Sequence, residues 1–139
     1  MRWSQLQRLI YSLWCDDIRL QIHCAGYPLS GSESVGRYWI TLGKEIIWDV
    51  PKDFPEECAK GTYNTVASEI TRVIRAYLDL PRGEVMTKVF ADDRWGLIDI
   101  FRAADRRLGT KRLAALAQSN LAAPAAKVLQ ARLSKARHA

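Results

Sequence analysis

Histidine and cysteine are scarce in this sequence of 139 residues, which holds two histidines and three cysteines. An odd number of cysteines cannot all pair within one chain, and the spacings of Cys15, Cys24 and Cys58 match neither a zinc site nor a redox motif. His23 falls within a predicted strand and His138 in the C-terminal tail, so the two are not expected to meet. We therefore expect no metal ligands, no cofactor, and three reduced, unreactive thiols in a reducing compartment.

Long apolar runs are also absent. No run reaches the roughly 18 apolar residues of a membrane-spanning helix, so no membrane association is expected. The N-terminal residues 1–5 do not resemble the apolar part of a secretory signal, which favours a cytoplasmic location. Hydrophobic residues make up 48% of the chain and charged residues 26%, values typical of a globular protein. At this length we expect one domain covering residues 1–139.

The hydrophobic patterns of the first part of the chain predict a helix and a small sheet. Apolar residues recur at helical spacing from Trp3 to Leu13. Apolar and polar residues then alternate from Ile18 to Cys24, as in a half-buried strand. A loop rich in glycine and serine follows at 26–36, and a hairpin with a two-residue turn at Gly43-Lys44 is predicted for 37–50.

The predicted hairpin register places Leu42 opposite Glu45 and Trp39 opposite Trp48. One face of the hairpin would then carry Trp39, Thr41, Ile46 and Trp48. The opposite face, with Tyr38, Ile40, Leu42 and Ile47, is equally apolar. Helices are expected to cover one face, and another segment of the chain or a partner to cover the other.

After a loop at 51–61, only helical patterns are found. The predicted helices are a long one ended by Pro81, a short one at 84–90, one capped by Asp92 or Asp93 that runs to Gly109, one capped by Thr110, and one with Pro124 in its first turn. The whole pattern predicts an α+β fold with a small antiparallel sheet of about three strands after an N-terminal helix. Residues 1–60 form the helix and sheet, and 61–139 form the helical part.

Positive charge is concentrated at the C-terminal end. Residues 101–139 carry nine Lys and Arg and one acid, a net charge of +8, whereas the whole chain is +6 and residues 1–100 sum to −2. Such a segment attracts an anionic partner, either nucleic acid, a membrane surface or an acidic protein. The candidate nucleic-acid contacts are Arg106, Arg107, Lys111 and Arg112. Plain solvated surface and pairing within the chain remain alternatives.

No catalytic constellation can be assembled from the sequence. The acid pairs at 16–17, 56–57 and 92–93 fall at helix ends or in loops, where capping and solvation explain them. The loop at 30–36 lacks the Lys-Ser/Thr ending of a phosphate-binding loop. We therefore expect a protein that is not an enzyme and has no catalytic residues.

Aromatic residues point instead to binding. The chain holds five Trp and five Tyr, and these residue types are enriched in the hot spots of protein interfaces. Trp3, Trp14 and Trp95 are expected to fill the core. Trp39 and Trp48 of the hairpin are expected to be partly exposed.

Three motifs resemble those of an uncharacterised family of short bacterial proteins. They are Met1-Arg2-Trp3-Ser4, Gly36-Arg37-Tyr38-Trp39-Ile40-Thr41, and Asp105-Arg106-Arg107-Leu108-Gly109-Thr110-Lys111-Arg112-Leu113. The chain departs from the family pattern at Thr110, where a basic residue is expected, and in the loop at 26–36, which lacks the family's acid- and His-rich character. The resemblance transfers no catalytic residue and implies a small accessory or binding protein.

We therefore expect a non-enzymatic protein-binding module, in particular an immunity protein that neutralises a cognate toxin domain, as in contact-dependent growth inhibition. The toxin would meet the net-acidic residues 1–100, whereas the basic C-terminal segment would repel a basic toxin. The candidate partner contacts are Trp39, Trp48, Glu33, Asp49, Asp53, Glu56 and Glu57. The alternative is a nucleic-acid-binding protein that uses its basic C-terminal helices. The oligomeric state is not predicted.

Overall fold

The computed structural model describes residues 3–28, 34–50, 63–90, 93 and 95–138. In chain order its elements are α1 (Trp3–Leu13), β1 (Leu20–Pro28), β2 (Ser34–Leu42), β3 (Glu45–Val50), α3 (Tyr63–Leu78), the short 3-10 helix η1 (Arg82–Glu84), α4 (Leu97–Ala104), α5 (Thr110–Ala117) and α6 (Ala123–His138). The predicted α+β class is confirmed: an N-terminal helix and an antiparallel sheet of three strands precede the C-terminal helices.

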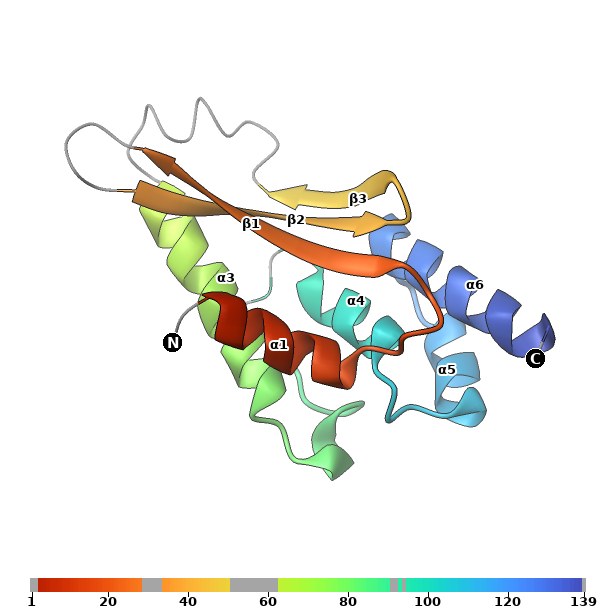
Figure 1. Cartoon of the computed structure of the whole chain (residues 1–139). Helices are drawn as coiled ribbons and strands as arrows, with labels where there is room; N and C mark the ends of the chain where they lie inside the picture. The colour runs from red at the N-terminus through yellow and green to blue at the C-terminus, as the bar shows by residue number, and fades with distance from the viewer. Residues whose placement is uncertain (1–2, 29–33, 51–62, 91–92, 94, 139) are drawn as a thin grey trace.

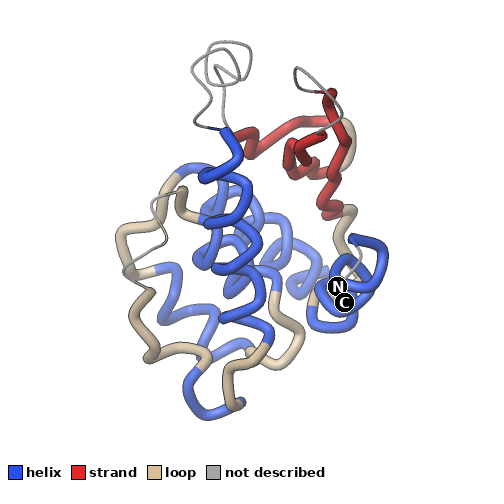
Figure 2. Tube along the Cα trace, turned by 90° about the vertical axis from the view of Figure 1, so that its left-hand side faces the viewer, coloured by secondary structure: helices blue, strands red, loops and turns tan. Residues whose placement is uncertain are grey.

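The molecule has two layers. The sheet, in the order β1-β2-β3, forms one layer, and the described helices lie together on one side of it (Figures 1 and 2). α4 lies in the middle of the helical layer, with α1 and α3 towards one end and α5 and α6 towards the other (Figure 1). The sheet therefore has an inner face against helices and an outer face that the described helices leave uncovered.

Alternation along the strands divides their side chains between these two faces. Ile22, Ile40 and Trp48 are buried on the inner face, at 0%, 0% and 5% exposure. Beneath them α3 contributes Ile70 and Tyr77, and the core continues through Leu97, Ile98, Ile100 and Phe101 of α4 to Val128 and Leu129 of α6. The helical stripes predicted from spacing thus form the core, because burying one apolar face stabilises each amphipathic element.

The turn of the hairpin is confirmed, but its register is not. Gly43 has the positive φ of 63° that glycine adopts readily, and Leu42 lies opposite Glu45. The register then shifts between Thr41 and Ile40, whose partners are Ile46 and Trp48, so Ile47 is an extra residue in β3. This bulge allows Trp48 to point into the core, and the prediction that Trp39 faces Trp48 on one surface is wrong.

Two helix boundaries differ from the prediction. The predicted helix at 84–90 is only the short η1, Arg82–Glu84. α4 ends at Ala104 rather than at Gly109, because the backbone of Asp105 is extended (φ −68°, ψ 118°). Asp105 forms an isolated antiparallel β-bridge with Trp14, which follows α1. The chain leaves the helix there to place Asp105 in the interior.

The helix starts follow the predicted chemistry in part. The carboxylate of Asp93 accepts hydrogen bonds from the backbone N–H groups of Leu97 and Ile98, at 3.1 and 2.8 Å, and so satisfies the start of α4 as predicted. Thr110 is the first residue of α5 rather than its cap, which is Gly109. Within the described residues, no helix is long and apolar enough to cross a membrane.

Candidate functional site

The outer face of the sheet brings an imidazole and an indole together. His23 of β1 lies opposite Trp39 of β2, and their rings stack at a centroid distance of 5.1 Å with 17° between their planes. Nε2 of His23 lies 2.9 Å from the hydroxyl of Thr41. Both rings are half-buried, so each is held by its neighbour while one side remains open to solvent.

On the β3 side of this face, an ion pair of zero net charge lies near an exposed apolar side chain. Arg37 donates to both carboxylate oxygens of Asp49, at 2.8 and 3.1 Å. Asp49 is the partner of Trp39 across the strands, and Ile46, opposite Thr41, is 57% exposed. The described part of the outer face thus combines aromatic and apolar contact area with charges that are already paired.

The structure divides the seven predicted partner contacts into three groups. Trp39 and Asp49 lie next to each other on the outer face. Trp48 is buried on the inner face, where its indole N–H donates to the backbone carbonyl of Trp95 at 3.0 Å. Trp48 is therefore removed from the candidate surface. Glu33, Asp53, Glu56 and Glu57 lie outside the described residues.

Sequence reasoning missed the pairing of His23 with Trp39. The two residues belong to strands separated by a loop, and only the register between β1 and β2 aligns them. The alternation of polar and apolar residues in β1 predicts that His23 points to the polar face. In β2, the alternation predicts that Trp39 and Tyr38 point to different faces of the sheet. Those two signals together identify a shared face, but not the contact.

The basic motif near the C-terminus surrounds a buried carboxylate. Asp105 is fully buried and accepts hydrogen bonds from the Tyr77 hydroxyl at 2.5 Å, from the Arg107 side chain at 2.7 and 3.0 Å, and from the Arg107 backbone at 2.9 Å. Burial by itself would raise the pKa of Asp105, but the bonds from Arg107 and Tyr77 outweigh it and lower the pKa. Burial and the neighbouring carboxylate raise the pKa of Tyr77 far above its usual value.

Arg132 of α6 completes this arrangement. Arg132 is 9% exposed, and its guanidinium donates to the backbone carbonyls of Ala103, Asp105 and Leu108. These are carbonyls at the end of α4 and in the segment that follows, which have lost their helical partners. One arginine thus donates to three carbonyls where the chain leaves α4.

Four of the nine Lys and Arg residues in the basic segment therefore make contacts within the fold. Arg107 and Arg132 bind around Asp105, Arg102 donates to the backbone carbonyls of Val85 and Lys88, and Lys127 pairs with Glu45. Of the four predicted nucleic-acid contacts, Arg106, Lys111 and Arg112 are exposed. Arg107 is held against Asp105, at a side-chain exposure of 20%.

Neither of the two thiols in the described residues, Cys15 and Cys24, has an activating environment. Burial, together with the hydrogen bond that the thiol donates to the Asp17 carboxylate, raises the pKa of Cys15 to about 11, and burial also raises the pKa of Cys24. Both thiols are thus neutral near pH 7 and poor nucleophiles. No group of three or more His, Cys, Asp and Glu suited to a metal occurs in the part of the chain that the structure describes. Cys58 lies outside that part.

Comparisons with known proteins give one match. No curated protein and no solved structure matches the chain. The model of the SF0329 protein family matches residues 2–65 and 55–133, which together span nearly the whole sequence. The resemblance to an uncharacterised family is confirmed at that level, and the chain belongs to the SF0329 protein family.

Proposed function

We propose that the protein is a binding module that uses the outer face of its sheet to bind another protein. The observation that carries this proposal is the stacked pair of His23 and Trp39, half-exposed on a face without a described helix. Large aromatic side chains bury much area for little loss of conformational entropy, which is why tryptophan is enriched in interface hot spots.

The outer face is prepared for contact before a partner arrives. The Trp39 ring stacks on His23, whose imidazole is hydrogen-bonded to the Thr41 hydroxyl. The Arg37–Asp49 ion pair lies next to Trp39 on the β3 side. A side chain already held in one orientation loses less freedom on binding than a mobile one. The exposed Ile46 extends the apolar contact area beside this centre.

Within this class, the specific proposal is an immunity protein that binds a cognate toxin domain. It rests on the aromatic outer face and on the net charge of −2 of residues 1–100. Because Asp49 is already paired with Arg37, the described face would supply mainly aromatic and apolar contacts rather than a free acidic surface. Trp39 is then the central contact, with His23 and Ile46 around it.

A two-stage experiment tests this function. The tagged protein is used to capture partners from a nuclease-treated lysate of its source cells, and the affinity of the captured partner is then measured by calorimetry. Trp39→Ala should weaken binding about 30-fold, as expected for a hot spot of roughly 2 kcal/mol. Leu9→Ala, an apolar truncation at a 42% exposed position on α1, is the matched control.

The immunity proposal makes a further demand. The captured partner must inhibit growth when expressed alone, and coexpression of this protein must restore growth, whereas its Trp39→Ala variant must restore less. A folded Trp39→Ala protein that binds its partner with unchanged affinity would remove the outer face from the interface. If the captured partner does not inhibit growth, the protein-binding proposal still holds, but the immunity proposal is ruled out.

A second candidate function is nucleic-acid binding at the corner between α4 and α5. It is favoured by three cationic side chains, Arg106, Lys111 and Arg112, which are exposed within seven positions of one another. Anisotropy titrations with a labelled 20-mer duplex would then show affinity that falls steeply with salt, with a log–log slope of about −0.9 for each phosphate contact. Replacing all three residues with glutamine should flatten that slope, and Arg8→Gln/Arg72→Gln/Arg75→Gln is the charge-matched control.

A further inference from the structure

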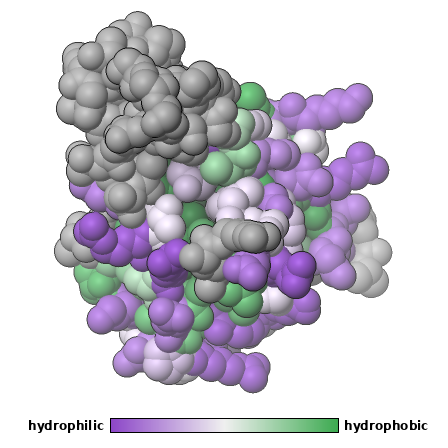
Figure 3. All heavy atoms as spheres, turned by 60° about the vertical axis from the view of Figure 1, so that its left-hand side comes forward, coloured by the Kyte–Doolittle hydropathy of each residue, from purple (hydrophilic) through white to green (hydrophobic). Residues whose placement is uncertain are grey.

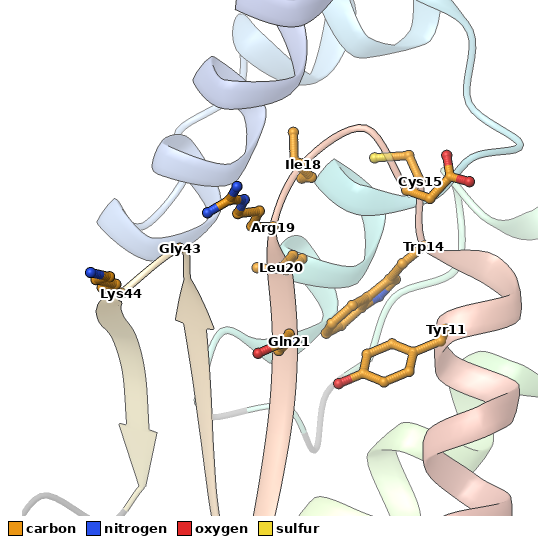
Figure 4. Close-up of a pocket in the computed structure, with 10 residues that line it drawn as sticks. Tyr11, Trp14, Cys15, Ile18, Arg19, Leu20, Gln21, Gly43 and Lys44 are labelled. Carbon is orange, nitrogen blue, oxygen red and sulfur yellow. The ribbon is translucent and has the colours of Figure 1, made fainter.

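A cleft of about 580 Å³ lies between α1, the start of β1 and the turn from β2 to β3. His23 and Trp39 are not among the residues that line it. The volume falls within the roughly 300–1,000 Å³ of pockets that bind small molecules. Figure 4 shows Tyr11 of α1 and Trp14, just after that helix, extending towards β1, and Arg19 and Lys44 on the other side of that strand.

The α1 side of the cleft is aromatic and rigid. Tyr11 and Trp14 have ring centroids 5.7 Å apart, and Trp14 also packs on Phe101 of α4 at 5.5 Å. The Tyr11 hydroxyl accepts from the N–H of Ile22 at 3.0 Å and donates to its carbonyl at 3.2 Å, which anchors this ring to the edge of β1. The two rings thus form a wall that exists before a ligand binds, in which Tyr11, 37% exposed, supplies most of the accessible surface and Trp14, 3% exposed, presents only an edge.

The opposite side of the cleft is cationic. Arg19 and Lys44 are both exposed, and neither has an ion-pair partner within the described ranges. The backbone N–H of Gly43 donates to the carbonyl of Arg19 at 2.8 Å, which ties the turn to β1. The two cations are therefore carried by backbone segments that are fixed relative to one another.

The charges lining the cleft sum to a small positive value. Asp16 is its one lining acid, against Arg19 and Lys44. Cys15 also lines the cleft, but burial raises the pKa of its thiol to about 11, so it adds no negative charge near pH 7. A net charge of about one positive unit complements a single negative charge better than a doubly charged phosphate.

We propose that this cleft binds a small aromatic carboxylate. The ring of the ligand packs against Trp14 and Tyr11, and its carboxylate lies towards Arg19 and Lys44. Gln21, which lines the strand between these two ends, offers an amide for a further hydrogen bond. This inference goes beyond the proposed protein-binding function, because neither His23 nor Trp39 lines the cleft, although Gln21 lies opposite Thr41 at its margin.

An NMR titration with two matched probes tests the proposal. Indole-3-acetate carries the aromatic ring and the negative charge, and indole-3-acetamide has the same shape without the charge. The acetate should produce saturable shifts in the amides of Gln21, Gly43 and Lys44 and in the indole N–H of Trp14. The acetamide should bind at least fivefold more weakly.

Variants identify the cationic side. Arg19→Gln/Lys44→Gln should weaken acetate binding at least fivefold and leave acetamide binding unchanged. Arg8→Gln/Arg82→Gln removes the same charge at exposed positions outside the cleft and should change neither. All four positions are exposed, so both variants should remain folded, as circular dichroism would verify.

Three results would overturn the proposal. They are shifts that do not saturate or that fall outside the cleft, equal affinity for acetate and acetamide, and full acetate affinity in the Arg19→Gln/Lys44→Gln protein. Because the titration involves neither Trp39 nor a protein partner, its failure leaves the proposed protein-binding function untouched. The loss of partner binding in Trp39→Ala likewise carries no consequence for the cleft.

Discussion

The group around Asp105 and the outer face of the sheet contain similar residue types in opposite environments. In the interior, a carboxylate, a tyrosine and two arginines satisfy one another and the backbone at the end of α4. On the outer face, a histidine, a tryptophan and an Arg–Asp pair satisfy one another while remaining open to solvent. The first arrangement stabilises the fold, and the second is available to a partner.

Figure 3 shows how hydrophilic and apolar side chains are distributed over one face of the molecule. On the face that Figure 3 shows, hydrophilic side chains project from most of the described surface, and apolar residues form small separate areas between them. Small scattered apolar areas are ordinary for a protein surface and do not mark an interface. Candidate contact surfaces are thus better identified from rigid aromatic side chains than from exposed apolar area alone.

The largest loss of stability is expected from a substitution of Asp105, the centre of the buried group. Asp105→Ala leaves Arg107 without its carboxylate and the Tyr77 hydroxyl without its acceptor, so the free energy of unfolding should fall by about 3–5 kcal/mol. Urea denaturation measures this loss. Asp79→Ala, at an exposed position in α3's C-terminal turn region, is the control and should change stability by less than about 0.5 kcal/mol. Similar stabilities for the two variants would contradict a structural role for Asp105.

A smaller loss is expected at Arg132. Arg132→Met retains much of the apolar stem but removes three hydrogen bonds to buried backbone carbonyls, of which the Asp105 carbonyl keeps the Leu108 N–H as a donor, and this should cost roughly 2–4 kcal/mol. Lys135→Met, three residues later at an exposed position of the same helix, should be close to neutral. If thermal unfolding of the two proteins coincides, Arg132 does not act as a cap for the end of α4.

Tyr77→Phe removes a single buried hydroxyl and should cost about 1–2 kcal/mol at neutral pH. The pKa of Tyr77 is raised in the fold, so its contribution is complete below the unfolded pKa of about 10 and is lost as the pH rises above it. The wild-type protein should therefore lose stability above pH ~10 more steeply than Tyr77→Phe. Denaturation curves collected between pH 7 and 11 test this, and parallel pH profiles would disprove it.

Asp105 gives the opposite pH dependence in acid. Because its folded pKa is lowered, its contribution is present above the unfolded pKa and is lost as the pH falls through the folded value. Denaturation curves of the wild-type protein and Asp105→Asn, collected at falling pH, test this. The loss of stability that protonation of Asp105 causes should be absent from Asp105→Asn.

The outer face should show the smallest effect on stability. Trp39→Ala removes a half-exposed ring and its stack on His23, so the unfolding free energy should fall by only about 1 kcal/mol. The same variant is expected to lose most of its partner binding. Chemical denaturation and calorimetry on one preparation would separate the two effects. If Trp39→Ala lowered the unfolding free energy as much as Asp105→Ala, Trp39 would stabilise the fold, and the contrast between the two regions would not hold.

Much of the fold could be predicted because its signals are local. The turn at Gly43, the stripe of α3 and the capping of α4 by Asp93 each depend on residues within a few positions of one another. The bulge at Ile47 could not be predicted in this way, because it depends on the core space beneath β3 that accepts Trp48. One extra residue in a strand reversed the face of a predicted contact residue.

The sequence by itself determined the α+β order of elements, the stripes that form the core and the concentration of positive charge near the C-terminus. Only the tertiary structure decided which of those charges remain exposed. Tyr77 and Arg132 reach the Asp105 group from 28 and 27 positions away in the chain, and no local pattern encodes contacts over such separations. Burial of a carboxylate requires cations and donors around it, so the fold of α4, α3 and α6 buried Arg132, held the partly exposed Arg107 against Asp105 and left Arg106 in solvent.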